Sequence, residues 1–173
     1  MGSIYQNGMR TQPDEAAMQE EQQGADQDDT QYTEAELAVI LSAIEDVIRD
    51  ESSDRYFFGY LLTMTPDDSD AEIINSIRID AVRHIEMFRQ LYFELSGRNP
   101  KELPALPFEQ PLTYCVGLRN ALLEELTEVV NYREILAGLK GRRHINALTA
   151  LITDELRHMG LFMNLYIKNE CDV

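Results

Sequence analysis

The sequence predicts an all-α protein built as a bundle of four long helices. Apolar residues recur at helical spacing in four separate stretches, and no stretch shows the alternation that is typical of strands. Four of the six prolines lie between the second and the third stretch. With 173 residues and 44% hydrophobic content, the chain can bury one sizeable core, so one folded domain is expected.

Residues 1–32 are expected to form a disordered acidic tail. This segment carries seven acidic residues against one arginine, is rich in glutamine and contains few large apolar side chains. Such a composition cannot offset the entropy lost on ordering. An acidic interaction arm is the alternative interpretation. The folded domain is expected over residues 33–170.

Capping signals delimit the first two helices. A capping box, Thr33-x-x-Glu36, precedes an apolar period that continues to about Thr63. A second capping box begins at Ser69, and the helix that follows it stops at Gly97. Two antiparallel helices with a short turn are therefore predicted here.

The last two helices are predicted from about Pro111 to Gly138 and from about Arg143 to Lys168. The proline-rich connector before them has about 15 residues and can span roughly 50 Å, whereas a helix of about 27 residues is roughly 40 Å long. It can therefore run along the whole bundle. Two antiparallel hairpins joined by one long crossover form the ferritin-like version of a four-helix bundle.

Two segments of the predicted bundle repeat one another. RIDAVRHIEMFRQLY in the second helix and ITDELRHMGLFMNLY in the fourth share residues in register at a constant offset of 74 positions. His84 corresponds to His158, but Ala81 stands where the later copy has Glu155. The two hairpins are thus predicted to be copies related by a pseudo-twofold axis.

Each apolar stripe is interrupted near its middle by an acid or a histidine. A carboxylate in a bundle interior costs several kcal/mol unless something compensates it. Acids and histidines that converge from four helices therefore indicate metal ions. The alternative is a metal-free polar core of buried Glu–His or Glu–Arg networks, the latter using Arg83 and Arg157. The interrupting residues are Glu51, His84, Glu125, Glu155 and His158.

Four segments resemble the helices of the ferritin-like di-iron carboxylate superfamily, in its rubrerythrin-type branch, over about residues 33–168. They are RDESSDRYFFGYLL, RHIEMFRQLYFELSG, EELTEVVNYREIL and TDELRHMGLFMNLY. The chain has no paired CxxC motifs, so the resemblance is to the catalytic bundle of rubrerythrins and not to their rubredoxin-like domain. The resemblance implies six metal ligands: Glu51, His84, Glu125, Glu128, Glu155 and His158.

Ala81 removes one carboxylate that this family carries on the second helix. Three interpretations compete. Asp80 turns inward and binds metal, Glu128 supplies the missing charge, or one metal position is weakened and leaves a mononuclear or vestigial site. We expect a retained but asymmetric site.

The resemblance implies a di-iron oxidoreductase of the peroxidase or ferroxidase type, connected with oxidative stress. It would reduce peroxide or dioxygen as Fe(II) is oxidised. Iron is the expected cofactor and manganese the next candidate. Glu128 would be the mobile catalytic carboxylate, and a separate donor protein would supply electrons. The resemblance also allows a homodimer. The rivals are a ferroxidase that handles iron and a non-enzymatic bundle with a degenerate metal site.

Charge and hydropathy exclude several classes of partner. A formal net charge of −16 argues against nucleic acid, and no apolar run is long enough for a membrane span. The N-terminus shows no signal-peptide pattern. Cys115 and Cys171 suggest no disulfide framework, with Cys115 as a small buried apolar residue. A reducing, cytoplasmic compartment is therefore expected.

Overall fold

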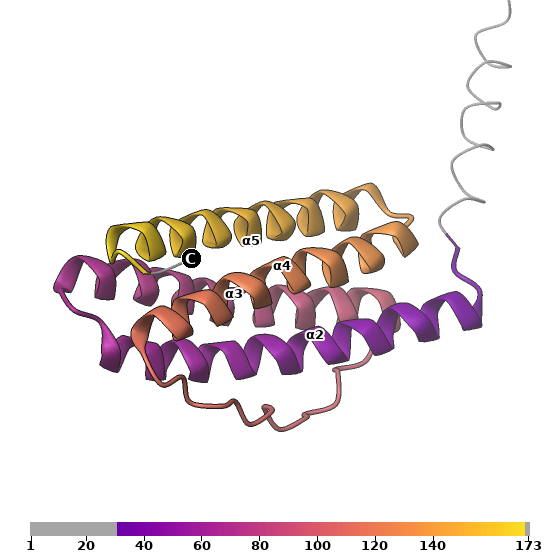
Figure 1. The fold of residues 1–173 in the computed structure, drawn as a ribbon. Coiled ribbons are helices and arrows are strands. Elements are labelled where there is room, and N and C mark those ends of the chain that lie inside the picture. The colour runs from indigo at the N-terminus through magenta and orange to yellow at the C-terminus, as the bar shows by residue number, and fades with distance from the viewer. Residues whose placement is uncertain (1–30, 172–173) are drawn as a thin grey trace, which may run out of the picture. The chain divides into compact units, whose positions relative to one another are not determined.

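The computed structural model describes residues 31–171, which contain four long helices and no strand. The tail expected over residues 1–32 lies almost entirely outside the described residues. Tyr32, at its end, packs against the helical core. The elements are α2 (Glu34–Leu61), a 3-10 turn η1 (Leu62–Met64), α3 (Asp68–Ser96), α4 (Tyr114–Gly138) and α5 (Arg142–Lys168) (Figure 1).

The helices form two hairpins joined by a long crossover, as the sequence predicted. Helix α2 packs along α3, α4 packs along α5, and the hairpins meet where α2 contacts α4 and α3 contacts α5. The crossover passes along α2 from one end of the bundle to the other (Figure 1). Backbone N–H groups of the crossover hold it there: Lys101 donates to Glu45 at 3.2 Å and Leu106 donates to Ser53 Oγ at 2.8 Å.

The helix starts follow local hydrogen bonding, with one correction. The capping box of Thr33 and Glu36 is present at the start of α2. The predicted box at Ser69 is wrong, because α3 begins at Asp68 and its cap is Asp67, whose side chain accepts from the N–H of Asp70 at 2.9 Å. An aspartate is among the strongest N-caps, so the earlier residue takes the position.

A polar band divides the hydrophobic core into two clusters. One cluster is centred on Ile44, Phe88 and Leu148, and the other on Leu61, Ile77 and Phe162. Between them lie the interrupting acids and histidines that the sequence predicted in mid-helix. Within the described residues, no helix is long and apolar enough to cross a membrane.

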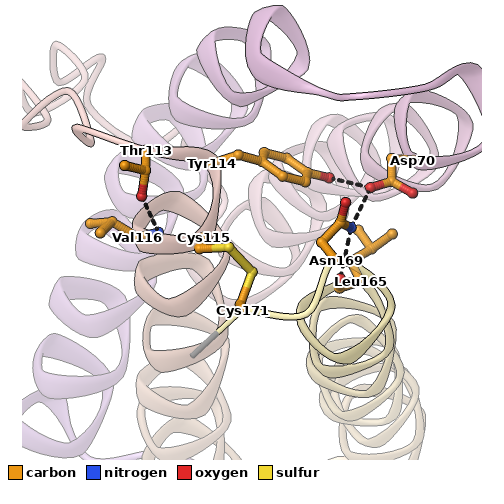
Figure 2. Close-up of a disulfide and its surroundings, with 8 residues drawn as sticks. All are labelled: Asp70, Thr113, Tyr114, Cys115, Val116, Leu165, Asn169 and Cys171. Atoms are coloured by element: carbon orange, nitrogen blue, oxygen red, sulfur yellow. Dashed lines mark hydrogen bonds between the residues drawn. A yellow bond between two sulfur atoms is a disulfide. The ribbon is translucent and has the colours of Figure 1, made fainter. Parts of the chain in front are cut away.

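The cysteine prediction is wrong, because Cys115 and Cys171 form a disulfide (Figure 2). It joins the start of α4 to the segment that follows α5, with the two Cα atoms 5.4 Å apart. The antiparallel α4–α5 hairpin brings these ends together, although 56 positions separate them in sequence. Disulfides are rare in reducing compartments, so the cysteines no longer support a cytoplasmic location.

A buried acid reinforces the same end of the bundle. Asp70 is fully buried and accepts hydrogen bonds from the Tyr114 hydroxyl at 3.0 Å and from Asn169 Nδ2 at 2.7 Å (Figure 2). Lys168 Nζ also contacts it. These bonds tie the starts of α3 and α4 to the end of α5. The buried carboxylate therefore finds its hydrogen-bond partners within the fold.

Candidate metal centre

All six ligand candidates from the sequence lie in the polar band at the middle of the bundle. Their side chains are between 0% and 7% exposed, so each is sequestered from solvent. On α5, for example, the helical register that buries Leu151 and Phe162 also buries Glu155 and His158 between them. The six residues are Glu51 on α2, His84 on α3, Glu125 and Glu128 on α4, and Glu155 and His158 on α5.

Five of these residues form two groups with metal-binding geometry. In the first group, ligand atoms of Glu51, His84 and Glu155 all lie within 4.8 Å of one another. In the second, Glu125, Glu155 and His158 meet the same limit. Glu155 belongs to both groups, which is the arrangement required of a carboxylate that bridges two ions.

The two histidines take matching orientations. His84 Nδ1 lies 2.8 Å from Glu51 Oε1 and 2.7 Å from Glu155 Oε1. His158 Nδ1 lies 2.9 Å from Glu155 Oε2 and 3.4 Å from Glu125 Oε2. The ring centroids are 5.7 Å apart and stacked. Both rings therefore present the same nitrogen to the carboxylates at the centre.

The carboxylates of the centre are incompletely hydrogen-bonded. Glu125 Oε2, Glu128 Oε1 and Glu155 Oε1 are buried without a hydrogen-bond partner among the described residues. Two of these oxygens lie close to a histidine nitrogen without the direction of a hydrogen bond. One Nδ1–H can serve only one of the two carboxylates that approach it. Unpaired buried oxygens of this kind are costly, and a cation would satisfy them.

The outer nitrogen of each histidine faces an aspartate of the other hairpin. His158 Nε2 lies 3.2 Å from Asp80 Oδ2, and His84 Nε2 lies 3.5 Å from Asp154 Oδ2. Arg157 contacts Asp80, and Arg83 contacts Asp154 at 2.6 Å. Asp80 therefore turns behind the histidine instead of inward, and in this position it orients the ring.

The structure does not show the Glu–Arg network of the metal-free alternative. The side chains of Arg83 and Arg157 are 53% and 45% exposed, and the pairs found for them are with Asp80 and Asp154. Neither pairs with a buried glutamate among the contacts of the described residues. The basic partners of Glu51, Glu125 and Glu155 are instead the two histidines.

Burial and neighbouring charges shift the pKa values of the acids and histidines at the centre. Burial raises the pKa of Glu51, Glu125 and Glu128, and the pKa values of the last two rise well above the ordinary range. Burial opposes the charging of His84 and His158, but hydrogen bonds to the glutamates raise the pKa of each to about 10. Only Glu155, between both histidines, has a lowered pKa in spite of its burial.

Comparison with known proteins gives one informative match. No protein-family sequence model and no curated protein matches the chain. Among solved structures, Desulfovibrio desulfuricans bacterioferritin superposes with a TM-score of 0.65 and 20% identity, over 78% of this chain and 83% of that one. The chain has a ferritin-like fold. The structure described for that bacterioferritin contains a diiron site.

Two further residues, Tyr132 and Asp54, lie beside the ligand candidates of the centre. Tyr132 is fully buried and its hydroxyl donates to Glu51. Asp54, one turn after Glu51, shares a side-chain hydrogen bond with Glu128. The repeat could have indicated Asp54, because it precedes Glu128 by the same 74 positions that separate the two histidines. Tyr132 has no comparable signal.

Proposed function

We propose that this protein is a di-iron oxidoreductase that oxidises Fe(II) with peroxide or dioxygen. One observation carries the proposal: two buried groups of carboxylate and imidazole ligands share Glu155 at the middle of a ferritin-like bundle. Carboxylates with imidazole suit iron, and manganese is the next candidate. The unpaired buried oxygens support the presence of cations. When bound, two Fe(II) ions supply the two electrons that convert hydrogen peroxide and two protons to two waters.

The proposal gives each side chain a distinct task. Glu51 and His84 would hold one ion, Glu125 and His158 the other, and Glu155 would bridge them. The paired positions of the two hairpins and the shared place of Glu155 support this division. Tyr132 would orient Glu51 through its hydroxyl.

Glu128 is proposed as the mobile catalytic carboxylate. It lies in the polar band, its Oε1 has no partner among the described residues, and burial raises its pKa. A carboxylate with one oxygen that has no fixed partner can change position when the charge of the centre changes. Electrons for further turnovers would come from a separate donor protein, and a homodimer stays a prediction.

An iron-handling ferroxidase is the second candidate. A solved structure with this fold is a bacterioferritin, which favours the ferroxidase candidate. A ferroxidase that feeds storage would assemble into a large shell and load far more iron than its ligand groups hold. Size-exclusion chromatography with iron analysis separates the two candidates. A non-enzymatic bundle with a degenerate site, suggested by Ala81, is the third.

The enzyme proposal is tested by the kinetics of iron oxidation. Chelator-treated protein is loaded anaerobically with Fe(II), mixed with stoichiometric peroxide, and followed by Fe(III) absorbance. We expect oxidation well above the rate of free Fe(II) and its loss in His158→Ala. The matched control is His144→Ala, because His144 pairs with Glu94 at 2.9 Å outside the polar band. Oxidation no faster than that of free Fe(II) would contradict the enzyme proposal.

A further inference from the structure

One acid near the centre has no role in the proposed ligand set. Asp54 lies on α2, one helical turn beyond Glu51, so both side chains leave the helix on nearly the same face. In the 74-residue repeat its counterpart is Glu128, just as Glu125 is the counterpart of Glu51. The repeat is therefore broken at Ala81, whose counterpart is Glu155. At Asp54 and its counterpart Glu128, both copies carry an acid.

Asp54 lies at the boundary between the polar band and solvent. It lines a pocket of about 400 Å³ formed by α2, α4 and crossover residues 106–109. Inward, it shares a side-chain hydrogen bond with Glu128. Because it contacts both the pocket and Glu128, its carboxyl connects the surface of the bundle to the centre.

The surroundings of Asp54 are acidic. Its strongest electrostatic neighbours are Glu51, Glu128, Glu124 and Asp50. Two adjacent carboxyls in such a place repel unless a proton or a cation lies between them.

A second observation points to a ligand at this place. Glu128 is 7% exposed, and its Oε1 has no hydrogen-bond partner among the described residues. The bond to Asp54 therefore leaves one oxygen of the pair unsatisfied. A divalent cation held by both carboxylates would relieve their repulsion and satisfy that oxygen as well.

We propose that Asp54 and Glu128 together bind a divalent cation of the centre, and that Asp54 supplies the carboxylate charge that the centre lacks at Ala81. This inference rests on the proposed di-iron function. Asp80 does not fill the role, because its carboxylate faces His158 Nε2 and two arginines. With Asp54 included, the acids of the centre are Glu51, Asp54, Glu125, Glu128 and Glu155.

The test compares metal binding in Asp54→Asn, the rescue variant Asp54→Glu and the control Asp50→Asn, all as the full chain. Asp50 is a half-buried acid of the same type in the same pocket. Chelator-treated proteins are titrated anaerobically with Co(II), and bound metal and visible absorption are recorded. Neither readout depends on turnover.

For Asp54→Asn we expect about 10- to 100-fold weaker binding of one equivalent and an altered Co(II) spectrum. Asp54→Glu should bind within about threefold of the wild-type protein, and so should Asp50→Asn. Wild-type affinity and spectrum in Asp54→Asn would overturn this inference and leave the di-iron proposal intact. An equal loss in Asp50→Asn would also overturn it, because a general charge effect would then suffice. A wild-type protein that binds no metal would overturn both proposals.

Discussion

The glutamates of the metal-free centre are expected to affect stability with opposite signs. Glu155 lies between two histidines, at 2.7 Å and 2.9 Å from their Nδ1 atoms, and its pKa is lowered. Glu128 is buried among other acids, and its pKa is raised well above the usual range by burial and by those charges. Ionised Glu155 therefore stabilises the metal-free fold, whereas an ionised Glu128 opposes it.

Glu155→Gln should lower the free energy of unfolding of the metal-free protein by about 3 kcal/mol at pH 7. We take the lower end of the range for breaking a buried ion pair because each histidine retains another carboxylate partner. His84 still contacts Glu51, and His158 still contacts Glu125. At about 3 °C per kcal/mol, the melting temperature falls by about 9 °C. The isosteric amide avoids a cavity, so lost charge dominates the change.

The matched control is Glu128→Gln, the same chemical change at a neighbouring buried position. It removes a carboxyl that burial and nearby acids disfavour, so stability should be unchanged or higher. Both variants are measured by urea unfolding and thermal melting in the presence of chelator. If Glu155→Gln is as stable as the wild-type protein, or if Glu128→Gln loses as much, the charge distribution derived for the centre is wrong.

Three further predictions concern the disulfide, protons and ring orientation. Reducing the Cys115–Cys171 disulfide, which joins residues 56 positions apart, should lower the free energy of unfolding by up to about 4 kcal/mol. Urea unfolding with thiol titration measures the change, and equal stability of the reduced and oxidised proteins would contradict it. His84 and His158 have pKa values of about 10 without metal, so both must lose a proton to bind a metal ion. The metal affinity should therefore rise with pH, and calorimetry in two buffers should detect proton release on binding. Binding without proton release would contradict this prediction. Asp80→Asn should weaken metal binding about tenfold in a Co(II) titration, and an unchanged affinity would exclude its orienting role.

Much of the fold could be predicted because the sequence carries its periodicity directly. The apolar period, the capping box at Thr33 and the prolines of the crossover each depend on neighbouring residues. The repeat added tertiary information, because two copies of one hairpin must place corresponding residues at the same level. That is why the sequence predicts that Glu51, His84 and their counterparts lie at one level of the bundle.

The remaining features depend on proximity that the chain order does not encode. The predicted antiparallel hairpin places the start of α4 and the end of α5 at the same end of the bundle, but it does not determine whether the two thiols come within bonding distance. The direction of Asp80 is set by Arg157 and His158 on another helix. Asp67 displaced Ser69 as the cap of α3 because two signals competed within one turn.

The most direct test of the di-iron account is the metal content of the protein. Full-length protein is stripped with chelator, loaded anaerobically with Fe(II), desalted and analysed for iron per chain. The account predicts about two equivalents, falling sharply in Glu155→Ala and His158→Ala but not in His144→Ala. Less than about half an equivalent, unchanged by the two site variants, would contradict it.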